Sequence, residues 1–256
     1  MNEKVKMNEK VKIVAKKIQS SKNMIFFTGA GISTESGISD YRSQGGIWDK
    51  FKPVYFDEFM SSSQARIKYW EQRLYMEKSL ANAKPNTGHK CIAELYHLGF
   101  LKHLITQNID GLHQESGIPD NRIIELHGNT RRVRCMSCDR LFSWKETQTM
   151  IDSGDMPPLC SCSGYLKPDT ISFGQAMPVE ETQQAVTLSS RSDVFIVVGS
   201  TLLVHPAASM PEYAKNNKAF LVIINLSSTP YDGVCDILIQ GKAGNVLKNI
   251  LECIKS

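Results

Sequence analysis

Short apolar runs alternate with longer amphipathic segments along most of this chain. Runs of strand length, which predict buried strands, occupy residues 24–27, 101–106, 123–126, 193–198, 220–225 and 237–240. Helical spacing of apolar residues, or a capping residue, predicts helices over residues 11–18, 86–98, 206–216 and 244–254, with Asn86 as an N-cap. Strands that alternate with helices indicate the α/β class, with a Rossmann-like parallel sheet covered on both faces.

Two segments depart from this alternation. Residues 35–85 contain no clear strand, and we interpret them as a helical insert with a cofactor loop, anchored by apolar residues such as Trp70. Residues 131–167 hold four cysteines and a Pro-Pro pair, which indicate a small inserted zinc-binding module. The Rossmann-like domain is then expected to comprise residues 1–34, 86–130 and 168–256.

Composition and charge narrow the class of protein. The 256 residues are 41% hydrophobic, which is ample for a core. A net charge of +4 is too small to indicate a dedicated nucleic-acid-binding protein. No apolar run approaches the roughly 20 residues that span a bilayer, and the Lys- and Glu-rich N-terminus lacks the apolar centre of a signal peptide. We therefore expect a soluble, cytoplasmic protein without a membrane partner.

The cysteines carry the clearest chemical signal. Cys135 and Cys138 form one close pair, and Cys160 and Cys162 form another. Four thiolates in two pairs match a tetrahedral, structural zinc site, whereas coincidental free thiols are the alternative. Because four thiolates complete the shell, the nearby His127 is available for another role.

Polar and glycine-rich motifs follow several predicted strands, at the edge where parallel sheets bind ligands. Gly29-Ala30-Gly31 and Gly199-Ser200-Thr201 suit approach to a phosphate, but each is also an ordinary tight turn. Thr34 stands where a dehydrogenase fingerprint needs its third glycine, which weakens a hydride-transfer interpretation.

Side chains with acid–base or amide chemistry occupy the same edge. Asn108 and Asp110 suit recognition of a carboxamide and a ribose, or else form an Asx turn that caps the next helix. His127 ends a strand, where it is either a general base or a structural histidine. The loop from Ser36 to Arg42 is either a ligand loop or a solvated turn with an ion pair.

Taken in order, these motifs resemble the sirtuins. The matching segments are GAGISTESGISDYR, TQNIDGLH, ELHG, the paired cysteines, LKPDTISFGQ, VVGSTLLVHPAA and IINLSSTPYD, and together they extend from about Ile13 to Leu251. The resemblance implies an NAD-dependent protein deacylase that takes acyl-lysine-containing proteins or peptides as partners. It also implies a large Rossmann-like domain, a small domain with structural zinc, and a cleft between them where NAD and acyl-lysine meet.

The resemblance also assigns residues by their position in the motifs. His127 would be the general base, and Asn108 and Asp110 would join it as catalytic residues beside the nicotinamide. The expected NAD contacts are Gly29, Ala30, Gly31, Thr34, Ile38, Tyr41, Arg42, Gln107, Asn108, Ile109, Asp110, Gly199, Ser200, Thr201, Asn225 and Ala243. The expected lining of the acyl-lysine channel is Ile171, Phe173, Gly174, Leu203 and Val204.

The implied reaction begins when nicotinamide leaves C1′ of the ribose and the acyl oxygen of the substrate attacks that carbon. His127 then removes a proton from a ribose hydroxyl, and free lysine, nicotinamide and acyl-ADP-ribose are the products. Tyr41 replaces a common Phe, the second cysteine pair is shorter than usual, and Gln175 replaces a common Glu. Tyr69 and Arg73 are four residues apart rather than the three that mark succinyl-preferring members, so we expect acetyl and other uncharged acyl groups.

Three other functions are compatible with parts of the sequence. Mono-ADP-ribosyl transfer to a protein would use the same NAD chemistry. A zinc-containing module that binds acyl-lysine or nucleic acid without catalysis would explain Arg131, Arg132 and Arg134 beside the cysteines. A dehydrogenase fits least well, because its glycine fingerprint is incomplete.

Overall fold

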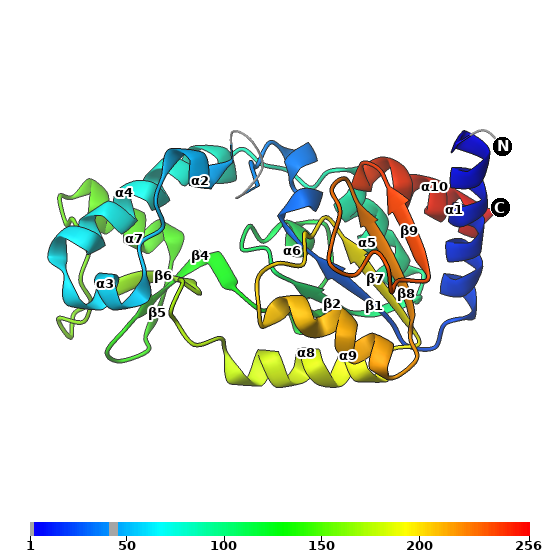
Figure 1. The fold of residues 1–256 in the computed structure, drawn as a ribbon. Coiled ribbons are helices and arrows are strands. Elements are labelled where there is room, and N and C mark those ends of the chain that lie inside the picture. Colours follow the sequence, from blue (N-terminus) through cyan, green and yellow to red (C-terminus); the bar gives the residue numbers. More distant parts are fainter. Residues whose placement is uncertain (1–2, 41–45) are drawn as a thin grey trace.

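A six-stranded parallel sheet forms the centre of the computed structural model, which describes residues 3–40 and 46–256 (Figure 1). Each neighbouring pair of strands in this sheet runs parallel. In their order across the sheet, the strands are β3 (Ile123–Glu125), β2 (Leu101–Thr106), β1 (Met24–Thr28), β7 (Val194–Val198), β8 (Phe220–Asn225) and β9 (Ile237–Gln240). The six strands predicted from the apolar runs are confirmed. The order reverses direction between β1 and β7, and such a switch point is where a parallel sheet opens a crevice for a ligand.

Helices cover both faces of the sheet, because its strands are apolar on both sides. Phe26 and Phe27 of β1 are fully buried and belong to two different cores. The first core lies under α1 (Glu3–Ser20), α5 (Thr87–His97) and α10 (Ala243–Lys255). The second lies under α8 (Val179–Arg191), η4 (Ala207–Ser209) and α9 (Met210–Asn216). The expected Rossmann-like α/β class is confirmed.

A smaller antiparallel sheet lies beside the large one, at the left of Figure 1. Its strands, in spatial order, are β5 (Leu141–Ser143), β4 (Gly128–Cys135) and β6 (Leu166–Thr170), and α7 (Trp144–Asp152) follows β5. The neighbouring helices are α2 (Ile47–Lys50), α3 (Phe56–Ser61) and α4 (Ser63–Leu80). Trp70 of α4 is fully buried in the core of this sheet, and its indole N–H donates to the Leu166 carbonyl at 3.1 Å. The helical insert and the cysteine-rich segment therefore share one core, and the domain boundaries given above stay a prediction.

Short elements occupy the connections at the carboxyl edge of the large sheet. They are η1 (Ala30–Ile32) and η2 (Thr34–Ser36) after β1, and α6 (Leu112–Glu115) after β2, whereas η3 (Asp120–Arg122) leads into the amino end of β3. Asn86 caps α5 as predicted, because its side-chain oxygen accepts from the backbone N–H groups of Gly88 and His89. Within the described residues, no helix combines the length and apolarity needed to cross a membrane.

Candidate active site

Two cavities meet at His127, which contributes to the lining of both. The larger, of about 430 Å³, lies at the carboxyl edge of the large sheet, and the smaller, of about 270 Å³, lies between that edge and the small sheet. Gln107 and Val204 also line both cavities. His127 therefore faces two neighbouring binding spaces from one position.

The larger cavity gathers most of the residues expected to contact NAD. Those that line it are Ala30, Gly31, Thr34, Gln107, Asn108, Gly199, Ser200, Thr201, Asn225 and Ala243. Asp40 of the loop from Ser36 to Arg42 also lines it, as do Leu226 and Ser227 directly after Asn225, whereas Glu35, Gly241 and Lys242 line it without having been singled out in the sequence. Gly29, Ile38 and Asp110 line neither cavity, Ile109 lines the smaller one, and Tyr41 and Arg42 lie outside the described residues.

The loops after β1 and β7 contact each other through their backbones. The Gly31 N–H donates to the Gly199 carbonyl at 2.8 Å, and the Gly29 N–H donates to the Val198 carbonyl at 3.0 Å. Gly199 has a φ of +65°, and a Cβ there would lie 2.3 Å from the Ile32 nitrogen. These glycines are therefore needed for the contact between the two loops, in addition to any contact with a ligand.

Asn108 and Asp110 both bind Ser33, which comes from the loop after β1. The Asn108 amide donates to the Ser33 hydroxyl at 3.2 Å, and that hydroxyl donates to an Asp110 carboxylate oxygen at 2.7 Å. The other Asp110 oxygen accepts from the Leu112 N–H at 2.9 Å, which forms an Asx turn just before α6, whose N-cap residue is Gly111. The Asx turn considered for Asp110 is therefore present, although Gly111 is the N-cap of α6, and Asn108 is 7% exposed at the wall of the larger cavity.

Two buried histidines, His89 and His113, lie beneath this wall, and the sequence assigned no role to either. His113 is hydrogen-bonded to the Thr28 hydroxyl at 2.9 Å, and that hydroxyl donates to Thr106 at 2.8 Å. The His89 and His113 ring centroids are 4.9 Å apart. Burial lowers the pKa of His113 well below its ordinary value, with a further contribution from His89. Burial also lowers the pKa of His89, against the opposing effect of Asp110 and Glu35. Both rings are therefore neutral near pH 7.

The ring of His127 is oriented by the loop after β2. Its Nδ1 lies 3.1 Å from the Gln107 carbonyl oxygen. Because a carbonyl only accepts, Nδ1 carries the proton, and in the neutral ring the lone pair is on Nε2. The His127 carbonyl accepts from the Ile171 N–H at 3.0 Å, which ties the histidine to the segment after β6. The next residue, Gly128, has a φ of +75°, and a Cβ there would lie 2.0 Å from the Asp169 carbonyl oxygen.

The smaller cavity is lined by the expected channel residues Ile171, Phe173, Gly174 and Val204, whereas Leu203 lines the larger cavity. One face of α4 supplies a further wall, formed by Tyr69, Gln72, Arg73 and Met76. The sequence drew attention to Tyr69 and Arg73 for acyl preference, but none of the four was among the expected channel residues. Helical periodicity could have placed these four on one face, but not against this cavity.

The three polar side chains of that wall are engaged within the protein, and Gln72 donates to the Lys52 carbonyl at 3.0 Å. Arg73 donates to Glu77 at 2.5 Å and to the Thr130 carbonyl at 3.2 Å, and its guanidinium lies 3.7 Å from the Trp144 ring centroid. The Tyr69 hydroxyl is hydrogen-bonded to the Thr170 hydroxyl at 3.2 Å. Burial alone would raise the pKa of the Tyr69 phenol, but the charge of Lys167 and nearby hydroxyl groups lower it below its ordinary value.

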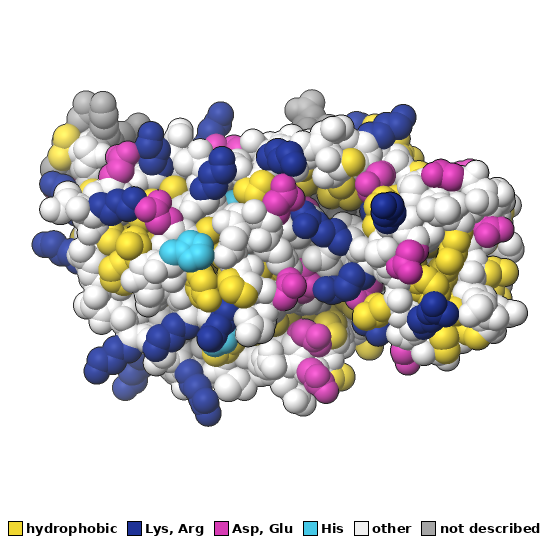
Figure 2. Space-filling model, turned by 180° about the vertical axis from the view of Figure 1, so that it is seen from behind, with side chains coloured by type: hydrophobic (Ala, Val, Ile, Leu, Met, Phe, Trp, Pro, Cys, Tyr) yellow, Lys and Arg dark blue, Asp and Glu magenta, His cyan; other side chains and the backbone are white. Residues whose placement is uncertain are grey.

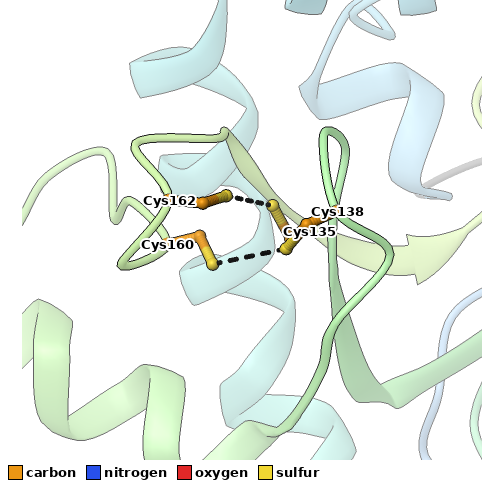
Figure 3. A group of neighbouring side chains, drawn as sticks. All are labelled: Cys135, Cys138, Cys160 and Cys162. Atoms are coloured by element: carbon orange, nitrogen blue, oxygen red, sulfur yellow. Dashed lines mark hydrogen bonds between the residues drawn. The ribbon is translucent and has the colours of Figure 1, made fainter.

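The four cysteines converge at the far end of the small sheet (Figure 3). Their sulfur atoms lie within 4.8 Å of one another, with Cys135–Cys162 at 3.6 Å and Cys138–Cys160 at 3.8 Å. Sulfur atoms around tetrahedral zinc are about 3.8 Å apart, given Zn–S bonds of about 2.3 Å. The arrangement therefore fits a closed, structural zinc site, and His127 is not part of it.

Comparison with known proteins identifies relatives along nearly the whole chain. The model of the Sir2 family matches residues 29–206. An NAD-dependent protein deacetylase of Thermodesulfovibrio yellowstonii is 40% identical over 98% of this chain and 98% of its own. An NAD-dependent protein deacetylase 1 of Bradyrhizobium diazoefficiens is 45% identical over 90% of this chain and 91% of its own. A solved Sir2 structure with a bound propionylated peptide is 32% identical, with a TM-score of 0.83 over 94% of this chain and 97% of that one.

Proposed function

Since this chain belongs to the Sir2 family, we propose that its two cavities bind NAD and an acyl-lysine side chain on either side of His127. The protein is an NAD-dependent protein deacylase, and it carries a structural zinc site. The single observation that carries the residue assignment is that His127 lines both cavities. A group in that position reaches both reacting partners.

The larger cavity is the proposed NAD site. The proposed contacts are small and polar residues that follow β1, β2, β7 and β8, or begin α10 after β9: Gly29, Ala30, Gly31, Thr34, Gln107, Asn108, Asp110, Gly199, Ser200, Thr201, Asn225 and Ala243. Ile38, Tyr41, Arg42 and Ile109 complete the proposal from the family resemblance. Support comes from the polar groups that line this wall, such as Ser200, which is 5% exposed and whose hydroxyl donates to the Gln107 side chain at 2.7 Å.

His127 is the proposed general base. Bound NAD supplies the ribose carbon to which the acyl oxygen transfers as nicotinamide leaves. Nε2 of His127 takes a proton from a ribose hydroxyl, because Nδ1 already donates to the Gln107 carbonyl. Asn108 and Asp110 hold the nicotinamide side of the pocket, each fixed through Ser33.

The smaller cavity is the proposed acyl-lysine channel, with the peptide added as a strand between the segments around Phe173 and Val204. Ile171, Phe173, Gly174, Leu203 and Val204 are its proposed contacts. Acetyl and other uncharged acyl groups are favoured, because the Arg73 guanidinium is already paired with Glu77 and stacked on Trp144. A carboxylate at the end of the acyl chain would have to compete with Glu77 for that charge.

A cytoplasmic location is part of the proposal. Its support is chemical: four thiolates that hold zinc remain reduced in the cytosol, whereas an oxidising compartment favours disulfides.

A matched set of peptides tests the proposal. Acetyl-, propionyl- and succinyl-lysine versions of one peptide are incubated with NAD, and mass spectrometry follows peptide, nicotinamide and ADP-ribose products. Equal amounts of free-lysine peptide, nicotinamide and acyl-ADP-ribose support deacylation. ADP-ribose that stays attached to the peptide would instead support mono-ADP-ribosyl transfer.

A further inference from the structure

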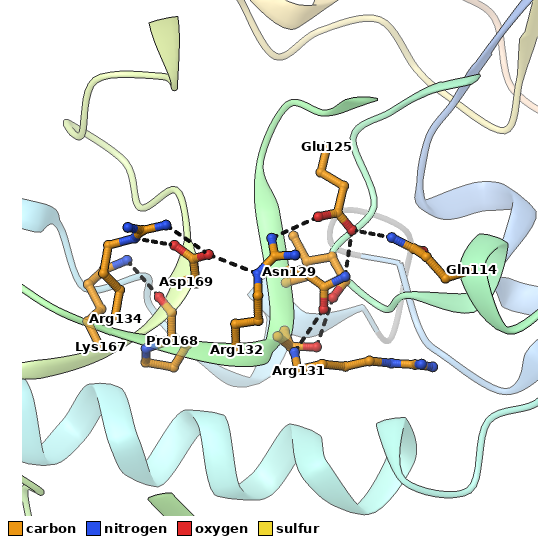
Figure 4. A network of polar contacts seen from close by, with 11 residues as sticks. Gln114, Glu125, Asn129, Arg131, Arg132, Arg134, Lys167, Pro168 and Asp169 are labelled. Carbon is orange, nitrogen blue, oxygen red and sulfur yellow. Dashed lines mark hydrogen bonds and ion pairs between the residues drawn. The ribbon is translucent and has the colours of Figure 1, made fainter. Parts of the chain in front are cut away.

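A continuous row of charged side chains crosses the junction between the two sheets (Figure 4). Arg132 of β4 donates to Glu125 at the end of β3 at 2.9 Å and to Asp169 of β6 at 3.0 Å. Arg134 donates to the other Asp169 oxygen at 2.8 Å. Figure 2 shows acidic and basic side chains side by side where the two lobes meet on the back face. We call Glu125, Arg132, Asp169 and Arg134 the charged brace.

The brace frames the segment that carries His127. Glu125 precedes His127 by two residues, and Asp169 precedes Ile171 by two residues. The Ile171 N–H donates to the His127 carbonyl at 3.0 Å, so the two carboxylates flank this backbone hydrogen bond between His127 and the channel segment. A rotation of one strand against the other would change the direction of the His127 ring relative to the acyl-lysine channel.

The large-sheet end of the brace is firmly held. One oxygen of Glu125 accepts from Gln114 at 2.7 Å and from Asn129 at 2.5 Å, while the other accepts from Arg132. The Glu125 side chain is 12% exposed. A partly buried carboxylate with this many donors keeps one orientation, and so fixes the strand end from which His127 follows.

The small-sheet end is equally constrained. The Asp169 side chain is 16% exposed and accepts from two arginines. Burial would raise the pKa of Asp169, but Arg134 and Arg132 lower it below the ordinary value, so the carboxylate is charged. Among the residues that the structure describes, only Arg132 donates to both carboxylates. Its planar fork suits two acceptors in a way that a lysine ammonium does not.

We propose that Arg132 is a positioning residue for deacylation, which holds the His127 strand end against the acyl-lysine channel by joining Glu125 to Asp169. This inference rests on the proposed role of His127. Arg132 touches neither cavity, so its effect on the reaction is transmitted through the backbone of the two strands.

Arg132→Met tests the proposal, because methionine keeps much of the aliphatic stem and removes both ion pairs. Arg131→Met is the matched control. Arg131 is the adjacent residue on β4, but its guanidinium pairs with Glu115 at 2.8 Å and its side chain points away from the brace (Figure 4). Each variant is assayed for deacylated peptide, for exchange of labelled nicotinamide into NAD, and for zinc content.

The exchange assay separates positioning from general damage. Nicotinamide leaves before His127 acts, so exchange needs both substrates but no functioning base. We expect Arg132→Met to lower kcat for deacylation about tenfold or more, with a much smaller loss of exchange and full zinc content. Arg131→Met should stay within about twofold of wild type in both assays, because its guanidinium pairs with Glu115 and contacts neither carboxylate of the brace.

Wild-type kcat in Arg132→Met, or equal losses of exchange and deacylation, would overturn the proposal. If Arg132→Met fails to hold zinc, Glu125→Gln tests the same link, since it removes the charge that Arg132 pairs with but preserves side-chain size. It should show the same selective loss. Absence of nicotinamide release by the wild-type enzyme would instead contradict the proposed function itself.

Discussion

The imidazole Nδ1 of His127 donates to the backbone carbonyl of Gln107 at 3.1 Å. Gln107 comes from the loop after β2, whereas His127 follows β3, so the ends of two neighbouring strands together determine the orientation of the His127 ring. The bond selects the tautomer with its lone pair on Nε2. A backbone acceptor cannot be removed by substitution, and the orientation of the ring is therefore built into the sheet.

The contact between Gly31 and Gly199 predicts that replacing Gly199 by a larger residue destabilises the protein. Gly199→Ala combines a positive φ with a Cβ placed 2.3 Å from the Ile32 nitrogen. We expect a loss of about 2–4 kcal/mol in the free energy of unfolding, and a weaker affinity for NAD. Thermal unfolding with and without NAD measures both.

Gly99→Ala is the matched control for that substitution. Gly99 has a φ of +83°, but nothing lies within 4 Å of its Cβ position. The free energy of unfolding of Gly99→Ala should fall by only about 1 kcal/mol, through backbone strain alone. The variant should keep the wild-type affinity for NAD. Equal losses in the two variants would show that the contact between the loops is unimportant.

The cysteine cluster predicts which thiols zinc requires. Cys138→Ser should reduce bound zinc from about one per chain to near zero, because structural zinc needs all four ligands. The core around Trp70 should then lose stability, since Cys135 and Cys160 belong to it. Elemental analysis and thermal unfolding report these changes. Cys253→Ser, far from the cluster in sequence and outside it in space, should keep its zinc.

The buried histidines predict a loss of stability in mild acid. The pKa of His113 is lower in the folded state than the roughly 6.5 of an exposed histidine. Above about pH 6.5 His113 is neutral in both the folded and the unfolded chain, so its contribution to the free energy of unfolding does not change with pH. Below it, the unfolded chain binds a proton that the folded chain excludes, and stability falls by up to about 1.4 kcal/mol per pH unit from this group.

Urea unfolding between pH 7.5 and 5 measures that slope. Asp169, Asp193 and Asp236 have lowered pKa values and so contribute at more acidic pH, outside this window. His113→Gln removes one titrating ring and should reduce the slope, leaving the contributions of His89 and His103, whose pKa values are also lowered by burial. A slope unchanged by this substitution would argue that His113 is not the group responsible.

The engagement of Arg73 predicts the preference among acyl groups. With its guanidinium paired to Glu77 and bonded to the Thr130 carbonyl, kcat/KM for acetyl-lysine should exceed that for succinyl-lysine by at least about tenfold. The comparison uses one peptide sequence with the two acyl groups. A preference for succinyl-lysine would mean that Arg73 exchanges Glu77 for the substrate carboxylate.

Much of the fold was predictable because local patterns determine it. The six strands of the large sheet are apolar on both faces, and the Asn86 cap follows from its own side chain. Helix α8 was not predicted: glutamine, threonine and serine dominate it, and Ala185 and Ser189 are its buried residues. Its position is determined by packing against the sheet, and the pattern of residues within the helix does not indicate that packing.

The candidate site was predictable where a residue acts from its own strand end, as His127 and Gln107 do. The contacts of Ser33 with Asn108 and Asp110 were not, because they join residues about 75 positions apart. The wall formed by Tyr69 and Arg73 depends on how α4 packs on the small sheet, through Trp70. Such contacts depend on tertiary packing, and periodicity only identifies the helix face that is available for them.

The most direct measurement compares the wild-type enzyme with His127→Ala, using NAD and an acetyl-lysine peptide, by mass spectrometry. The wild type should form free-lysine peptide, nicotinamide and acyl-ADP-ribose in equal amounts. His127→Ala should lose deacylation by about 100-fold or more, yet keep its zinc, its thermal stability and its affinity for NAD. Deacylation by His127→Ala at the wild-type rate would contradict the assignment of His127 as the general base.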